Sequence, residues 1–301
     1  MPVIADKTGA EASSPAAAMP GGRATGGGGA TGGGGGGGGT GGDGDGDGGA
    51  GSAGGGGGAG SAAADARSAF PDWRFAPNIG GHPDLYEIEN RALDPGGHVL
   101  AAMRGLAPWD GRTLVDLGCG TGFWLPGYAR DASRVIGIEP DPALRRAAAR
   151  RIRGLPGVRV RPGSAEHLPL EDRSVDVAHA RFAYFLAPGA DAGLAEVLRV
   201  LKPGGSLVVV DNDHHWGQFA EILAAASSAP PASNSSAIDA WWRDRGATRR
   251  AVRSEWRFET RADLEAVLRI EFPAAAADTW LARNPAATGL SYGYVLFCAV
   301  A

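Results

Sequence analysis

Three glycines and a later glutamate form the most informative pattern in this sequence. Gly118, Gly120 and Gly122 follow a short apolar segment that is typical of a buried strand, and a predicted helix follows them. Glycine leaves no Cβ between the chain and a ligand, so such a loop can bring backbone N–H groups against a nucleotide-like molecule. Glu139 ends the next predicted strand, 21 residues after Gly118, where a carboxylate can accept hydrogen bonds from two ribose hydroxyls.

The residue at position 123 narrows the class of ligand. A dinucleotide-binding loop has glycine there, because the backbone must approach a pyrophosphate closely. In this chain the position is Phe123, and Trp124 follows it. The two rings disfavour a nicotinamide dehydrogenase. They favour a ligand that carries a nucleoside without phosphates.

Strands and helices are predicted to alternate through the middle of the chain. The predicted strands are residues 113–117, 134–139, 158–161, 175–179 and 206–211. The predicted helices between them are residues 123–130, 142–152 and 190–200. This alternation predicts an α/β fold with a Rossmann-like, doubly wound and mostly parallel sheet. A ligand is expected at the carboxyl ends of its strands.

The flanking segments are expected to complete a single domain over residues 70–301. Its parts are an N-terminal helical cap (70–108), the cofactor-binding core (109–212) and a C-terminal part on the substrate side (213–301). Predicted cap helices are 85–93 and 99–106, and later helices are 215–226, 238–245 and one capped by Thr260 that ends near 270. Residues 227–236 are expected to form a loop. Strands 254–258 and 292–300 predict a late antiparallel pair at the sheet edge.

Residues 1–69 differ from the rest of the chain in composition. They hold more than half of the 50 glycines and contain no leucine and no aromatic residue. Such a segment cannot bury enough apolar surface to offset its ordering entropy, so a disordered tail is expected. An Asp-Gly run at 43–48 lacks the closing glutamate of a calcium loop, because Gly54 stands there, and no metal site is expected.

Charge and cysteine content exclude several classes of function. Residues 70–301 carry nearly equal numbers of basic and acidic side chains, which disfavours nucleic acid as a partner. The two cysteines, Cys119 and Cys298, suggest no disulfide framework. No signal peptide is recognisable, and the longest apolar run, 294–301, is too short to span a bilayer. A cytoplasmic protein without membrane contact is expected.

Over residues 110–212 the chain resembles the class I S-adenosylmethionine-dependent methyltransferases of the small-molecule type. The resemblance covers five segments in order, at 115–122, 137–141, 163–170, 175–177 and 198–205. It implies S-adenosyl-L-methionine as the cofactor and a small molecule as the methyl acceptor. It also implies a set of cofactor-binding residues, namely Tyr86, Asp116, Gly118, Cys119, Gly120, Gly122, Glu139, Pro140, Ser164, Ala165 and Ala180.

The resemblance assigns a role to several members of this set. The glycine loop would contact the methionine part of the cofactor, and Asp116 would help to hold its ammonium group. Glu139 would bind the ribose. Ser164 and Ala165 would lie at the adenine edge, where the family often has aspartate in place of Ser164. Tyr86 would contact the cofactor from the cap.

Methyl transfer does not require a catalytic dyad, since the cofactor's sulfonium already activates the methyl carbon. The catalytic residues are therefore left unknown. A hydroxyl acceptor would benefit from a base, and the candidates are His214, His215, Tyr184 and His179.

Other functions and roles remain open at this point. The acceptor could be RNA or protein, although residues 180–183 lack the Asn/Asp-Pro-Pro-aromatic motif of many enzymes that methylate base amino groups. The chain could also bind the cofactor without chemistry. Trp241, Trp242 and Trp256 could line an aromatic substrate pocket or pack in the core. The arginines between 145 and 153 could form a solvated face. The oligomeric state is left open.

Overall fold

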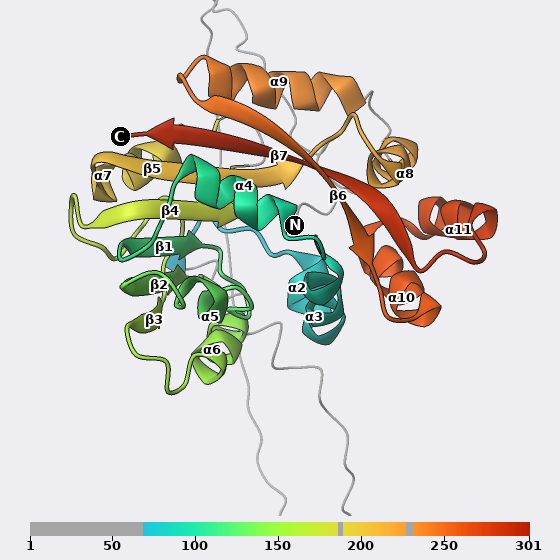
Figure 1. Cartoon of the computed structure of the whole chain (residues 1–301), viewed down its shortest axis with the longest axis horizontal. Helices are drawn as coiled ribbons and strands as arrows, with labels where there is room; N and C mark the ends of the chain where they lie inside the picture. The colour runs from blue at the N-terminus through green and yellow to red at the C-terminus, as the bar shows by residue number, and fades with distance from the viewer. Residues whose placement is uncertain (1–68, 186–188, 227–230) are drawn as a thin grey trace, which may run out of the picture. The chain divides into compact units, whose positions relative to one another are not determined.

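The computed structural model describes residues 69–185, 189–226 and 231–301 of the chain (Figure 1). The predicted tail lies outside the described residues, except for Ala69. Part of the loop predicted at 227–236 also lies outside them.

A seven-stranded sheet organises the fold, in the order β3-β2-β1-β4-β5-β7-β6. Five strands are parallel: β1 (Thr113–Leu117), β2 (Arg134–Ile138), β3 (Val158–Arg161), β4 (Val175–Arg181) and β5 (Leu201–Asn212). Strand β7 (Gly289–Val300) runs antiparallel to β5, and β6 (Thr248–Arg257) runs antiparallel to β7. The predicted Rossmann-like sheet with a late antiparallel edge pair is confirmed. The strand order reverses between β1 and β4, which is where such sheets bind ligands.

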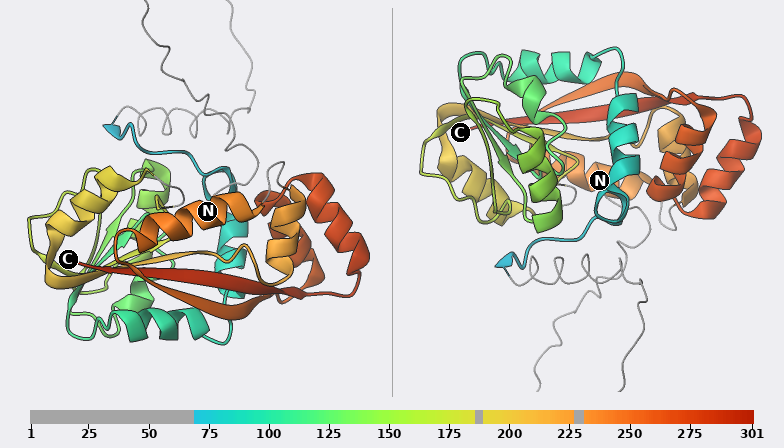
Figure 2. Two further views of the ribbon diagram at one scale, coloured as in Figure 1. Left: turned by 90° about the horizontal axis from the view of Figure 1, so that it is seen from above. Right: turned by 90° about the horizontal axis from the view of Figure 1, so that it is seen from below.

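Helices cover both faces of the sheet. Successive side chains of a strand point to opposite faces, and the central strands carry apolar side chains on both. Met103 of α4 (His98–Leu106) and Tyr128 of α5 (Leu125–Tyr128) pack on the face that carries Leu114 and Val177. Helices α7 (Asp191–Val200) and α9 (Pro231–Arg243) pack on the opposite face, which carries Ala178. Figure 2 shows α4 on one side of the sheet and α7 and α9 on the other.

Five helices gather beside the antiparallel end of the sheet. The cap helices α2 (Pro77–Gly81) and α3 (Pro83–Ala92) pack against α10 (Arg261–Glu271), and α8 (Gln218–Ala226) packs against α11 (Ala274–Arg283) and β7 (Figure 1). Helix α6 (Pro142–Arg151) follows β2, and Asp141 caps it by accepting hydrogen bonds from the N–H groups of Ala143 and Leu144. Thr260 caps α10 as predicted, through the N–H of Asp263.

The structure corrects several predicted boundaries. Helix α9 begins at Pro231, so the predicted loop at 227–236 is wrong for its last six residues. Helices α2 and α11 were not predicted, and α5 is only four residues long because Gly127 follows Pro126 in its short segment. Strand β4 continues two residues beyond the predicted end, to Arg181.

The tryptophans of the C-terminal part belong to the core. Trp256 is fully buried, and the ring of Trp242 stacks on Phe297 with centroids 5.4 Å apart. Trp241 is also buried and lies under the guanidinium of Arg245, 3.9 Å from its ring centroid. None of these three rings lines the cavity described next. Core packing is therefore their role.

Candidate functional site

A cavity of about 790 Å³ opens at the carboxyl ends of β1, β2 and β4. Its wall includes most of the predicted cofactor residues, namely Tyr86, Asp116, Gly118, Cys119, Gly120, Glu139, Pro140, Ser164 and Ala165. Gly122 and Ala180 do not line it. Ala180 belongs to the core on the opposite face of the sheet, because side chains alternate along β4.

The glycine loop is in left-handed backbone conformations and in close contact with its surroundings. The φ angles are +66° at Gly118 and +57° at Gly120. A Cβ at Gly118 would lie 2.7 Å from Ala183 Cβ, and one at Gly120 would lie 2.7 Å from Ile79 Cδ1 of α2. Both positions require glycine, because only glycine combines this φ with this lack of space.

Gly122 has a packing role on the far side of the same loop. Its φ is +74°, and a Cβ there would lie 3.0 Å from Ala148 Cβ of α6. The third glycine therefore lets α6 pack closely against the loop.

Glu139 joins the glycine loop to the loop after β2. Its side chain is buried; one carboxylate oxygen accepts a 2.8 Å hydrogen bond from Gly120 N–H and the other accepts one of the same length from Asp141 N–H. Burial raises the pKa of this carboxyl to about 7, against the opposing effect of the two backbone donors. Each oxygen keeps a second lone pair for a ligand hydroxyl. The Gly120 N–H is thus already used within the protein.

Asp116 lies in β1 directly before the loop. Burial raises the pKa of its carboxyl from 3.8 to about 7, and the nearby Arg181 acts in the opposite direction. None of the residues with described side chains donates a hydrogen bond to this carboxylate. A cationic ligand group is a chemically suitable partner for it.

Ser164 and Ala165 form a small turn at the other end of the cavity. Both are buried, and the N–H of Ser164 bonds to the carbonyl of His167 at 3.3 Å. The Ser164 hydroxyl lies 3.5 Å from His167 Nδ1.

The cap reaches the cavity through Tyr86 and Asn90 of α3. Burial raises the pKa of the Tyr86 phenol well above 10. Glu87 anchors the same helix, since its carboxylate pairs with Arg151 of α6 at 2.7 Å and accepts the hydroxyl of Thr121. Arg145, in the same helix as Arg151, donates to the carbonyls of Glu139 and Pro140. Two of the clustered arginines therefore fix the site and do not form a free basic face.

The structure brings one of the four candidate bases to the cavity. Tyr184 lines it, but its hydroxyl donates to Glu166 at 2.6 Å and accepts from Gly193 N–H at 3.1 Å. Burial and the Glu166 carboxylate raise the pKa of this phenol above its ordinary value.

The three histidines lie elsewhere. His179 is fully buried, and its ring centroid lies 5.1 Å from the ring centroids of both Trp109 and Tyr128. Burial lowers the pKa of its imidazole to about 3. His215 Nε2 lies 3.1 Å from Ser235 Oγ, and neither His215 nor His214 lines the cavity.

Several residues of the cavity wall were not singled out from the sequence as site residues. Among them are Trp73, Phe75, Asn90, Trp124, Arg181 and Phe182. The alternation of side chains along β4 could have found Arg181, since it lies two residues beyond His179, but β4 was predicted to end too early. Phe182 and Tyr184 have φ angles of +50° and +56°, an uncommon conformation for such residues. The turn after β4 is therefore held in an unusual shape beside the cavity.

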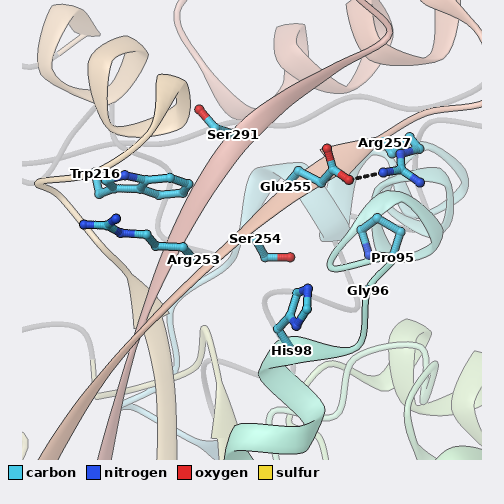
Figure 3. Close-up of a pocket in the computed structure, with 9 residues that line it drawn as sticks. All are labelled: Pro95, Gly96, His98, Trp216, Arg253, Ser254, Glu255, Arg257 and Ser291. Atoms are coloured by element: carbon cyan, nitrogen blue, oxygen red, sulfur yellow. Dashed lines mark hydrogen bonds and ion pairs between the residues drawn. The ribbon is translucent and has the colours of Figure 1, made fainter.

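A second hollow, of about 500 Å³, lies over the edge strand β6 and its neighbour β7 (Figure 3). Arg253 lies beside the ring of Trp216, 5.1 Å from its centroid, and Arg257 pairs with Glu255. No sequence-predicted site residue lines this hollow.

Among the described residues, no group of three or more His, Cys, Asp or Glu side chains is arranged to hold a metal ion. No described helix is both long and apolar enough to cross a membrane.

The residues of the cavity fit an adenosine ligand with an amino-acid end. Glu139 offers two carboxylate oxygens, and Asp116 offers a buried carboxylate to which no residue with a described side chain donates a hydrogen bond. The glycine loop adds a close backbone surface between them. Cys119 is a packing residue, since its sulfur would lie 2.7 Å from a Cβ at Gly137 and burial raises its pKa well above 9.

The middle of the chain is similar to known methyltransferases. A family described as "Methyltransferase domain" matches residues 115–209. An uncharacterised 37.1 kDa protein in transposon Tn4556 of Streptomyces fradiae is 44% identical over 107 residues, 34% of this chain and 31% of that protein. Demethylmenaquinone methyltransferase of Thermobifida fusca is 33% identical over 136 residues, 44% of this chain and 58% of that protein.

The chain spans only part of the length of these curated relatives, from about a third to somewhat over half. Among solved structures, an S-adenosylmethionine-dependent methyltransferase from Aquifex aeolicus has a TM-score of 0.49 and 18% identity, covering 76% of this chain and 100% of that one. The family match includes the glycine loop, Glu139 and β4. Residues 115–209 therefore match a methyltransferase domain.

Proposed function

We propose that this chain is a cytoplasmic enzyme that transfers the methyl group of S-adenosylmethionine to a small-molecule acceptor. One observation carries the proposal. A single cavity is lined by most of the predicted cofactor residues, among them Ser164, Glu139 and Asp116. Its lining also includes four aromatic side chains, here called the aromatic wall: Trp73, Phe75, Trp124 and Phe182. A cofactor and an apolar acceptor could therefore meet in the same space.

When bound, the cofactor supplies a methyl carbon that its sulfonium makes electrophilic. The protein binds and orients. Glu139 accepts hydrogen bonds from the ribose hydroxyls, and Asp116 holds the ammonium group by charge. The backbone at Ser164 and Ala165 contacts the adenine. The aromatic side chains exclude water and hold the acceptor in line with the methyl carbon.

The cavity favours an acceptor atom that is nucleophilic without help from histidine. No histidine lines it, and the hydroxyl of Tyr184 is engaged with Glu166 and Gly193. Among the carboxyls of its lining, Asp116 and Glu139 are assigned to the cofactor, Asp141 caps α6, and Asp72 Oδ1 lies 3.7 Å from His167 Nδ1. An electron-rich ring carbon meets these conditions. The quinone methyltransferases among the relatives, from Thermobifida fusca and Rubrivivax gelatinosus, make reduced naphthoquinones the first acceptors to test.

The test uses the full chain with S-adenosylmethionine and reduced menadione. S-adenosylhomocysteine and the mass of one added methyl group are followed by mass spectrometry. Titration calorimetry then compares the Glu139→Ala and Glu139→Gln variants with the unaltered chain. Glu139→Ala would lose two hydrogen bonds to a charged group, so we expect it to bind the cofactor about a hundredfold or more weakly. The affinity of Glu139→Gln should lie between those of Glu139→Ala and the unaltered chain.

Unchanged cofactor affinity in Glu139→Ala would contradict the ribose assignment. Cofactor binding without S-adenosylhomocysteine formation, across phenol, amine and thiol acceptors as well, would favour a cofactor-binding protein without chemistry. Methylation of added RNA in preference to the small molecules would contradict the acceptor class.

A further inference from the structure

Two opposite charges face the same cavity from neighbouring strands. Asp116 of β1 pairs in register with His179 of β4, so Arg181 lies two residues further along β4. Residues two apart on a strand share a face, which places Arg181 on the face of the sheet that carries Asp116. Both residues line the cavity, beside Gly118.

The guanidinium of Arg181 is held in place by groups that do not neutralise it. Its Nη1 lies 3.5 Å from the sulfur of Met103, and a thioether sulfur is a weak acceptor. The group lies over the ring of Trp124, 3.9 Å from the centroid. Its Nε is buried, and no acceptor for it is present among the described residues. Arg181 is therefore an oriented cation with unused donors.

No described carboxylate lies within ion-pair distance of Arg181, and this includes Asp116. The two charges are nevertheless close enough that the field of Arg181 lowers the pKa of Asp116 against the effect of burial. His179, two residues before Arg181 on β4, is uncharged at neutral pH because burial lowers the pKa of its imidazole to about 3. Arg181 is thus the positive group on this side of the cavity.

A ligand that carries both charges satisfies both residues. An α-amino acid has an ammonium group for Asp116 and, two bonds away, a carboxylate whose geometry matches the planar guanidinium fork. We infer that Arg181 binds the carboxylate of the methionine part of S-adenosylmethionine, so that Asp116 and Arg181 together form a receptor for its zwitterionic end. This inference rests on the proposed function.

The test compares two ligands that differ only in that carboxylate. S-adenosylmethionine and its decarboxylated analogue share the adenosine, the sulfonium and the ammonium. Titration calorimetry on the full chain is expected to show that S-adenosylmethionine binds about ten- to a hundredfold more tightly, as befits a charged hydrogen-bonded pair. In the Arg181→Gln variant this discrimination should disappear, through weaker binding of S-adenosylmethionine alone.

Two variants serve as controls. Arg181→Lys keeps the charge without the fork and should retain part of the discrimination. Arg74→Gln removes a cation from the exposed side of the cavity wall, where it bonds to the carbonyls of Pro71 and Trp73, and should retain all of the discrimination.

Three results would overturn the inference. Equal binding of the two ligands by the unaltered chain would do so without any variant, and therefore even if Arg181→Gln does not fold. An equal loss for both ligands in Arg181→Gln would mean that Arg181 acts only through the structure. If Arg181→Gln left cofactor binding unchanged but raised the KM of an anionic acceptor, Arg181 would bind the acceptor and not the carboxylate of the cofactor. If the unaltered chain binds neither ligand, the proposed function fails together with the inference.

Discussion

Arg151 of α6 lies 2.7 Å from Glu87 of the cap helix α3, atom Nη2 to atom Oε2. The same carboxylate accepts the hydroxyl of Thr121 in the glycine loop, and Arg151 Nη1 also donates to that hydroxyl oxygen at 3.2 Å. One carboxylate therefore joins the cap, the loop and the helix after β2. Both partners of the ion pair are largely shielded from water, so this contact should matter more than an exposed pair.

Replacing Arg151 by alanine should loosen the cap over the cofactor. We expect the dissociation rate of S-adenosylhomocysteine to rise several-fold and the free energy of unfolding to fall by about 1 kcal/mol. Stopped-flow displacement and urea denaturation measure the two quantities. Arg150→Ala, in the neighbouring exposed position, is the matched control and should change neither. Equal dissociation rates for the two variants would show that the ion pair does not hold the cap.

The unliganded stability of Asp116→Asn should depend on pH differently from that of the unaltered chain. A carboxyl whose pKa rises from 3.8 to about 7 on folding stabilises the fold fully below pH 4, and that contribution is lost as the pH rises through 7. The asparagine variant has no such loss. Its unfolding free energy, relative to the unaltered chain, should rise by up to about 3 kcal/mol between pH 5 and pH 8.

Urea denaturation at the two pH values measures this difference. Asp84→Asn removes an exposed carboxylate at the start of α3 and should show only a small dependence on pH. A difference that stays constant for Asp116→Asn over this range would mean that its carboxyl is ionised as in water.

Gly122→Ala should separate the cost of backbone conformation from that of packing. Gly122 and Gly111 have similar φ angles, +74° and +67°, but a Cβ at Gly122 meets Ala148 at 3.0 Å while a Cβ at Gly111 meets nothing within 4 Å. Gly111→Ala should therefore cost about 1 kcal/mol of stability, and Gly122→Ala about 1–3 kcal/mol more. Denaturation curves of both variants test this. If the two cost the same, α6 yields to the added methyl group.

The parallel strands could be predicted from the sequence because each contains apolar residues in a run or in alternation and is followed by turn residues. The predicted range of β1 matches the observed strand. Strand β6 was predicted only over its last residues, since Thr248–Arg253 carries three arginines and no regular apolar alternation. An edge strand pairs on one side alone and tolerates such residues, so its periodicity is weak. Helix α11 begins with a run of alanines, of which only Ala277 is buried, so the run shows no clear apolar face in the sequence.

The cofactor side of the site could be predicted better than the acceptor side. Glu139 and the glycines are fixed by a local strand–loop spacing that the sequence displays directly. The aromatic wall is assembled from Trp73, Phe75, Trp124 and Phe182, which come from distant parts of the chain and meet only in the folded structure. His179 faces the core and not the cavity. Which of the two a strand residue faces depends on strand register, which the sequence leaves undetermined.

Strand β7 lies between β5 and β6, although β6 precedes it in the chain. During synthesis on a ribosome, β6 therefore emerges before the strand that it pairs with. A nascent chain that stops short of Gly289 would lack two strands of the sheet and not one. Its apolar residues on β5 would stay open to chaperones until the last strand arrives.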